Sequence, residues 1–328
     1  MGKYLRLALI LVVLAVVWHL RGGIGDVRNA LHTAGLLGLA AIVAFHLLPM
    51  ALCGLSWHSL MPDTPTLTFI LGRWVREGVG ELAGFLPLSG EMAGMRLLTK
   101  RGIRSTQAAA MTVVDITAEV LSQFIFTLFG VSLWLWRYPG SEVTHWSLIG
   151  LAISVPVLLA FVVVQRSAMV RLIETLPSRL MPKTWATPET ESGLHAAIAG
   201  LYSNRRRVLR AVTIHLAAWV TSTGEAGLAL VLLGHPLGVM DVLALESVIF
   251  ALRSAAFAVP AAIGIQEGAY MVVGAALGLP AEVALAVSLL KRGRELTLGV
   301  PALFIWHWVE GKSRPASSLS QTLGSGAK

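Results

Sequence analysis

Two pairs of glutamates with the same spacing lie in otherwise apolar parts of the sequence. Glu91 and Glu119 form the first pair, and Glu267 and Glu295 form the second. One constant shift, which we call the repeat offset, carries positions 90–119 onto 266–295 and gives seven identities without a gap. Many membrane transporters are built from internal repeats, with polar sites where the repeats meet. The pattern therefore predicts a duplicated unit whose buried acids serve transport.

Further charged residues lie in the same apolar segments. Asp115 precedes Glu119 by one helical turn, so both carboxylates share one helical face. Basic residues crowd one turn of the last apolar segment, and the simplest geometry sets them against the acids of both repeats. A charge at mid-membrane costs roughly 2.5–3.5 kcal/mol unless a partner or water offsets it, so we expect a polar cavity that a lipid headgroup crosses. Mutual neutralisation that only holds the helices together is the alternative. The predicted pathway residues are Glu91, Arg96, Asp115, Glu119, Glu267, Lys291, Arg292, Arg294 and Glu295.

The composition places most of the chain in lipid. Hydrophobic residues make up 55% and charged residues 13% of the sequence, with a mean hydropathy of +0.72, whereas a soluble domain carries about 25% charged residues. The formal net charge of +8 does not indicate nucleic-acid binding, because the basic residues lie beside apolar segments, as membrane orientation requires. Cys53 is the only cysteine, and the nine histidines lack metal-ligand spacing, so we expect no disulfide, metal or other cofactor. Single histidines such as His46 and His215 are interpreted as core or interfacial residues.

The apolar segments predict an all-α polytopic membrane protein with about six transmembrane helices and two re-entrant helical hairpins. The predicted spans cover about 5–20, 34–60, 105–136, 146–165, 211–233 and 281–309. Two further segments, 66–101 and 240–278, are each too long for one crossing. Irregular backbone at membrane depth survives only when buried in protein or lining a wet cavity, which favours hairpins that enter and leave on one side. The predicted hairpin breaks are Pro87, Gly90, Pro260 and Gly264.

The first hairpin segment also carries charges of both signs on one helical face. These residues follow three- and four-residue spacing: Arg73, Arg76, Glu77 and Glu81. One interpretation is a solvated cytoplasmic helix with ion pairs. The Gly-rich apolar stretch that follows favours insertion into the membrane instead.

The distribution of basic residues predicts the orientation. With both termini in the cytoplasm, most of the Lys and Arg residues outside the spans fall on the cytoplasmic side, as the positive-inside rule requires. The two hairpins then enter from opposite sides, which makes an inverted repeat. The chain is predicted to form a single membrane domain over 1–310. Its parts are repeat 1 at about 34–136, a cytoplasmic connector at about 166–210 and repeat 2 at about 211–309, followed by a polar tail over 311–328.

The second hairpin and last span resemble the C-terminal signature of the lysylphosphatidylglycerol synthase transmembrane family. The matching positions are Pro260, Gly264, Glu267, Gly278 and Arg292. Gly90-Glu91 and Arg96-Leu97 resemble the other motif of the family. The Lys-Arg-x-Arg-Glu-Leu run from 291 to 296 and the Pro-x-Leu-x-x-Trp motif from 301 to 306 look closest to the hopanoid-associated HpnL subgroup.

The resemblance implies an inner-membrane lipid translocase, or flippase-like protein, rather than an enzyme. It implies a hopanoid-like membrane lipid as substrate and proteins of lipid biosynthesis or export as partners. Two alternatives stay open. One is a membrane-embedded lipid-modifying transferase, with Asp115 and Glu119 as its acid and base. The other is a non-transporting scaffold that recruits biosynthetic enzymes through 166–210.

Overall fold

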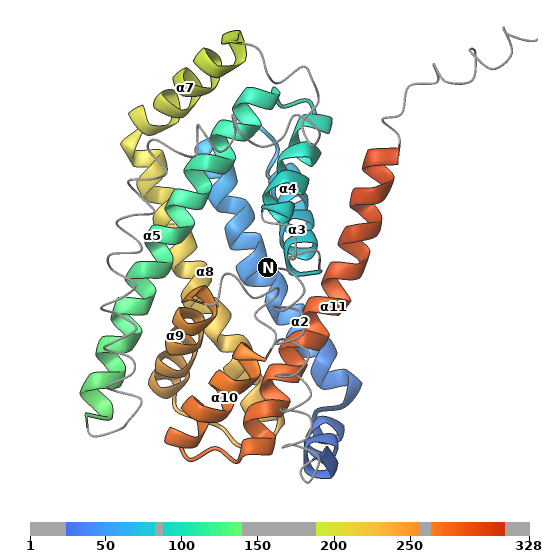
Figure 1. The fold of residues 1–328 in the computed structure, drawn as a ribbon, viewed down its shortest axis with the longest axis vertical. Helices are drawn as coiled ribbons and strands as arrows, with labels where there is room; N and C mark the ends of the chain where they lie inside the picture. Colours follow the sequence, from blue (N-terminus) through green and yellow to red (C-terminus); the bar gives the residue numbers. More distant parts are fainter. Residues whose placement is uncertain (1–23, 83–87, 140–187, 256–263, 312–328) are drawn as a thin grey trace, which may run out of the picture.

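The computed structural model describes residues 24–82, 88–139, 188–255 and 264–311, and all regular secondary structure in these ranges is α-helical. This confirms the predicted all-α class for the described part of the chain. The predicted spans at 5–20 and 146–165 and the tail after 311 lie outside it. The helices, drawn in Figure 1, are α2 Ile24–Leu60, α3 Thr66–Leu82, α4 Ser89–Lys100, α5 Ser105–Arg137, α7 Pro188–Ser203, α8 Arg205–Leu232, α9 Val239–Ala255, α10 Ile265–Ala276 and α11 Ala281–Gly311.

The longest helices have the dimensions and surface of membrane spans. Two stretches, His32–Leu60 and Ser105–Arg137, are long and apolar enough to cross a bilayer. Helices α8 and α11 are about 42 and 46 Å long at 1.5 Å per residue, and they carry charged residues that the bundle interior buries. Large apolar side chains project outward from these helices, among them Leu37, Phe129 and Phe304. Water disfavours so much exposed apolar surface, whereas lipid covers it, which indicates a membrane protein.

The helices of the two predicted repeats correspond at the repeat offset. Shifting both ends of α4 by this offset gives the ends of α10, and shifting the first residue of α5 gives the first residue of α11. The backbone follows the same offset. Leu88 and Gly264 have left-handed φ angles of 61° and 82°, and Gly102 and Gly278 have φ angles of 94° and 77°. In both halves, therefore, one left-handed residue precedes the second hairpin helix and another precedes the long helix.

Each long helix packs against the other half of the molecule. Helix α5 contacts α8 and α9, and α11 contacts α2 and α3, around a central pair formed by α2 and α8. Figure 1 shows α5 and α11 running in opposite directions, with the α3–α4 hairpin towards one end of the bundle and the α9–α10 hairpin towards the other. The two halves are thus interlocked rather than placed side by side.

Small residues allow these helices to approach closely. A Cβ atom on Gly78 of α3 would collide with Ala302 of α11, and one on Gly130 of α5 would collide with Ser247 of α9. Small residues at helix crossings permit backbone contact in membranes, where packing drives association. The two crossings join each hairpin to a long helix of the bundle.

Two of the four predicted hairpin breaks lie in the described ranges. Gly264 is directly before α10, in the left-handed conformation noted above. Gly90 is not at the break but in the first turn of α4, where a Cβ atom would collide with the backbone of Arg76 on α3. The left-handed residue before α4 is Leu88 instead. Pro87 and Pro260 lie outside the described residues.

The predicted connector over 166–210 is helical where it is described. Helix α7 occupies 188–203, and α8 begins at Arg205, before the predicted start of the span at about 211. Asn204 caps α8, because its side chain accepts a hydrogen bond from the backbone N–H of Arg207 at 3.2 Å. The basic run that begins at Arg205 therefore forms the first turn of α8.

Candidate functional site

A cavity of about 360 Å³ lies between α2, α3, α5, α8, α9 and α11. We call it the central cavity. One part of its lining is apolar and comprises Pro49, Met50, Cys53, Ala218, Trp219 and Phe250. The other part is polar and mostly charged, and comprises His46, Arg73, Glu77, Glu81, Glu119, Gln123, His215, Ser222, Glu225, Arg253, Lys291 and Arg294. Four permanent cations thus oppose four carboxylates, so the charges balance when the histidines are neutral.

Glu119 is held by two guanidinium groups from α3. Arg73 donates two hydrogen bonds to its carboxylate, at 2.7 and 3.2 Å, and Arg76 donates one at 2.8 Å. Arg76 also donates to Glu91 on α4 at 3.1 Å. The two arginines are three residues apart on α3 and so share a face. They link α3 to Glu119 on α5, and Arg76 also links α3 to Glu91 on α4.

Asp115 lies one turn before Glu119 and is almost fully buried, with 1% of its surface exposed. Its Oδ1 atom is 2.7 Å from Nε2 of His215 on α8, and its Oδ2 atom is 3.7 Å from Arg73. His215 comes from the second half of the chain, so this contact joins the two halves. A buried carboxylate without such partners would be strongly unfavourable.

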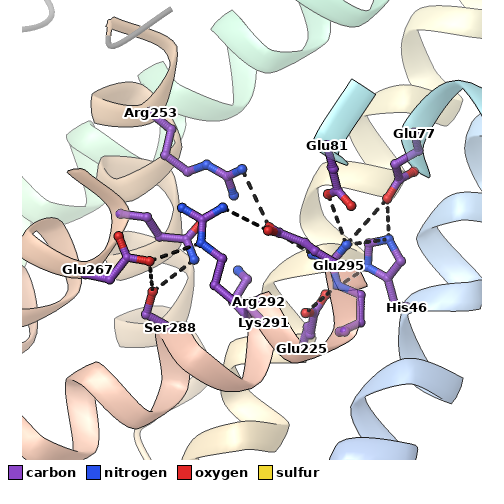
Figure 2. A network of polar contacts seen from close by, with 12 residues as sticks. His46, Glu77, Glu81, Glu225, Arg253, Glu267, Ser288, Lys291, Arg292 and Glu295 are labelled. Carbon is purple, nitrogen blue, oxygen red and sulfur yellow. Dashed lines mark hydrogen bonds and ion pairs between the residues drawn. The ribbon is translucent and has the colours of Figure 1, made fainter. Parts of the chain in front are cut away.

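In the second half, Glu267 and Arg292 form the contact that the sequence predicted between an acid and the basic turn. Arg292 Nε donates to Glu267 at 3.0 Å, and its Nη1 donates to Glu295 at 2.8 Å. Glu267 also accepts a hydrogen bond at 2.7 Å from the backbone N–H of Gly264, which stabilises the start of α10. Figure 2 shows this group beside Arg253, whose Nη2 atom is 3.8 Å from Glu295.

Arg294 connects α11 to three other helices, α2, α3 and α8. It donates to Glu225 on α8 and to Glu81 on α3, both at 3.2 Å, lies 3.6 Å from Glu77, and its Nη1 atom is 3.3 Å from Nε2 of His46 on α2. His46 on α2 lies between Glu225 and Glu77, at 2.8 and 2.5 Å from their carboxylates. Figure 2 shows His46, Glu77 and Glu81 gathered around this contact. Both halves of the chain therefore contribute to one charged network.

Lys291 lines the central cavity and forms a buried ion pair with α9. Its Nζ atom donates to Glu246 on α9 at 2.6 Å, and the two side chains are 4% and 0% exposed. The hydroxyl of Tyr270 also donates to Glu246. The ammonium lies over the rings of Phe250 and Tyr270, at 5.3 and 5.6 Å from their centroids, where cation–π attraction adds to the ion pair.

A family model described as the lysylphosphatidylglycerol synthase TM region matches residues 5–302. The chain belongs to this family. Together with the apolar outer surface, the match indicates a membrane protein involved in lipid handling. The curated proteins and the solved structures give no match to the chain.

In this family member, the predicted pathway residues are divided among several contacts. Glu119, Lys291 and Arg294 line the central cavity. Arg292, Glu267 and Glu295 contact one another but are not among the lining residues. We expected the basic turn to face all the acids, but Glu91, Asp115 and Glu119 contact arginines of α3 instead. Arg96 lies on α4, partly buried, and does not line the cavity.

Nine charged or histidine residues of the site were not among the predicted pathway residues: His46, Arg73, Arg76, Glu77, Glu81, His215, Glu225, Glu246 and Arg253. Glu225 and Glu246 each stand in an apolar stretch, so the reasoning from membrane insertion that selected Glu267 applies equally to them. His46 was interpreted as a core or interfacial histidine. It is buried, but it contacts two carboxylates.

The carboxylates are arranged for ion pairs rather than for a metal. Within the described ranges, no group of three or more His, Cys, Asp or Glu residues is placed to hold a metal ion. Each acid that lines the cavity has a cation or histidine within 3.2 Å. Chemically, the cavity can bind the polar groups of an amphiphile by exchanging these contacts, and its histidine–carboxylate pairs can exchange protons.

Proposed function

We propose that this protein is a lipid translocase that moves an amphiphilic lipid across or out of the inner membrane. The headgroup would cross through the central cavity while the hydrocarbon part stays in the bilayer. The observation that carries the proposal is the composition of the cavity lining, which combines charged and apolar side chains. At about 360 Å³ the cavity has the size of a small-molecule pocket and suits a headgroup. Paired charges of both halves inside a membrane bundle are typical of a substrate pathway.

The two halves would act as an inverted repeat with re-entrant hairpins. Supporting this are the corresponding helix ends at the repeat offset and the opposite directions of α5 and α11 in Figure 1. In such transporters, one repeat moves against the other around a fixed site. Arg294 and His46 would be exposed to opposite sides in turn, because their partners belong to both halves. Both termini would be cytoplasmic, as the distribution of basic residues predicts.

The proposed substrate is a hopanoid or a related amphiphilic lipid. Its support is the likeness of the 291–296 run to the hopanoid-associated subgroup. Proteins of lipid biosynthesis or export would then be the partners. Comparing lipids of the inner and outer membranes with and without the gene would identify the lipid, since loss of the translocase should deplete its substrate from the outer membrane.

Transfer in reconstituted vesicles tests the translocase activity. Arg294→Gln should abolish transfer of a labelled lipid between leaflets, because it removes the cation that joins both halves. Arg137→Gln is the matched control, since Arg137 contacts Asp241 at 2.8 Å away from the cavity and should leave transfer unchanged. Equal transfer by the wild type and Arg294→Gln, at equal amounts of protein in the membrane, would contradict the proposal.

A lipid-modifying transferase is a second candidate, favoured by the contacts of His46 with Glu77 and Glu225 in the cavity. A histidine between two carboxylates is a suitable general acid or base. Purified protein, incubated with a lipid and a labelled donor, would form a modified lipid only under this alternative. The His46→Gln variant would then lose product formation.

A further inference from the structure

Arg253 differs from the other cations that line the central cavity. The others are hydrogen-bonded to carboxylates: Arg73 to Glu119, Arg294 to Glu225 and Glu81, and Lys291 to Glu246. In the described part of the chain, Arg253 has one ion contact, at 3.8 Å to Glu295. That distance exceeds a hydrogen bond, and the hydrogen bond that Arg292 donates to Glu295 at 2.8 Å goes to the other carboxylate oxygen. The guanidinium of Arg253 therefore has N–H groups that no carboxylate in the described ranges accepts.

The neighbourhood of Arg253 is apolar on one side. Phe250 lies one turn earlier on α9, and its ring meets the ring of Trp219 on α8 edge-to-face, with centroids 5.0 Å apart. Trp219 in turn stacks on Phe126 of α5. Trp219, Phe250 and Arg253 all line the cavity. An amphiphile with a negative group next to its hydrocarbon part would find complementary surfaces there.

Two glutamates of the polar lining disfavour a negative group near them. Glu77 and Glu81 line the cavity from α3, and their side chains are each 21% exposed. Figure 2 shows Arg253 on one side of Glu295 and these two glutamates on the other. These glutamates repel an anion, and the other cations of the lining are already hydrogen-bonded to carboxylates. Among the lining cations in the described ranges, Arg253 is the one without a carboxylate at hydrogen-bond distance, and this favours it as the place for the anion.

We propose that Arg253 is the docking residue for an oxyanion, a phosphate or carboxylate, of the molecule that enters the central cavity. Guanidinium groups bind both anions through paired, charge-assisted hydrogen bonds. The inference rests on the proposed function in one respect: the cavity receives a lipid headgroup. It adds that this headgroup is acidic and that its anion binds at the second half of the chain.

Binding of a short amphiphile to the purified full chain in phosphatidylcholine nanodiscs tests this site. The probes are octyl phosphate, inorganic phosphate and the uncharged octyl glucoside, with affinity followed by calorimetry. Octyl phosphate should bind the wild type and lose about tenfold or more in affinity in Arg253→Gln, because a charge-assisted contact is removed. Arg253→Lys should recover part of the loss, and Arg137→Gln should bind like the wild type.

The probes also separate the source of the anion. Octyl phosphate binding well above inorganic phosphate supports a lipid headgroup, while equal affinities support a free oxyanion at the same residue. Equal binding of octyl phosphate to the wild type, Arg253→Gln and Arg253→Lys, or binding to none of them, would overturn the proposal. Loss of lipid transfer by a variant that still binds octyl phosphate would concern the proposed translocase and not this site.

Discussion

In the first hairpin unit, α3 to α5, an ion pair has its cation on the hairpin and its anion on the long helix. In the second, α9 to α11, the charges are exchanged. Arg73 is the eighth residue of α3, and Glu246 is the eighth residue of α9. Asp115 and Lys291 correspond at the repeat offset, each as the eleventh residue of its long helix. Arg73 lies 3.7 Å from Asp115, and Glu246 lies 2.6 Å from Lys291.

This exchange indicates what the position requires. A substrate-binding role would need one particular sign of charge, whereas a contact that holds a hairpin against its long helix needs only opposite signs. The surroundings differ as well. Arg73 is part of a network with Glu119 and Arg76, while the pair of Glu246 and Lys291 is enclosed by Phe250 and Tyr270. We infer that the pair holds the hairpin against the long helix in both units. Arg73 also belongs to the polar pathway through Glu119 and Arg76, whereas the enclosed pair of Glu246 and Lys291 is mainly structural, although Lys291 lines the cavity.

The largest effect should come from breaking the second pair alone. Glu246→Gln leaves the ammonium of Lys291 buried without its counter-charge, which costs about 3–5 kcal/mol. Unfolding of the purified protein in detergent should show this loss. Asp241→Asn, on the same helix but in a contact with the partly exposed Arg137, is the matched control and should cost about 1 kcal/mol or less. Similar stabilities of the two variants would refute the structural role.

Breaking the first pair should destabilise the protein less. In Arg73→Gln, Asp115 keeps His215 at 2.7 Å and Glu119 keeps Arg76 at 2.8 Å, so neither acid is left alone. We expect a loss of about 1–3 kcal/mol in the same unfolding experiment. Lipid transfer should be largely lost although the protein stays folded, because Arg73 lines the cavity. A stability loss as large as that of Glu246→Gln would remove the distinction between the two units.

Exchanging the charges of the second pair tests whether its sign matters. Glu246→Lys and Lys291→Glu should each destabilise strongly, since each places like charges together in a buried site. The double variant has the polarity of the first unit and should recover most of that loss, with a residual of about 1–2 kcal/mol from altered packing. A double-mutant cycle measures the coupling. Additive losses would mean that the pair's orientation is fixed by something besides its charges.

The helices were largely predictable from the sequence, because glycine, proline and charge interrupt the apolar runs where helices end. The helix Ser105–Arg137 occupies the predicted span over 105–136, and the helix Ala281–Gly311 occupies that over 281–309. The limbs of the two hairpins likewise end close to the predicted segments. Local signals are sufficient for such boundaries. The earlier start of α8 reflects the cap at Asn204, which the charge pattern did not indicate.

The pairing of charges was less predictable. The repeat offset identified Glu91, Glu119 and Glu267, since a charge in an apolar run is visible in the sequence. Which cation meets which acid depends on the depth at which two helices cross, and a shift of one turn changes every partner. The first-half acids therefore pair with α3 rather than with the basic turn on α11. Only the packing of α11 on α3 brings Arg294 to Glu81.

The smallest effects concern the backbone position that both units share before the second hairpin helix. The first unit has Leu88 at φ 61° and the second has Gly264 at φ 82°. A left-handed conformation costs a non-glycine residue about 1–2 kcal/mol, partly offset because glycine is more flexible when unfolded. Leu88→Gly should therefore stabilise the protein by up to about 1 kcal/mol, and Gly264→Ala should destabilise it by about 1–2 kcal/mol, in thermal unfolding.

Changes in the free energy of unfolding that are equal in size and opposite in sign would indicate that the two positions are equivalent in backbone conformation as well as in sequence offset. Destabilisation by Leu88→Gly would instead assign the Leu88 side chain a packing role that Gly264 does not share.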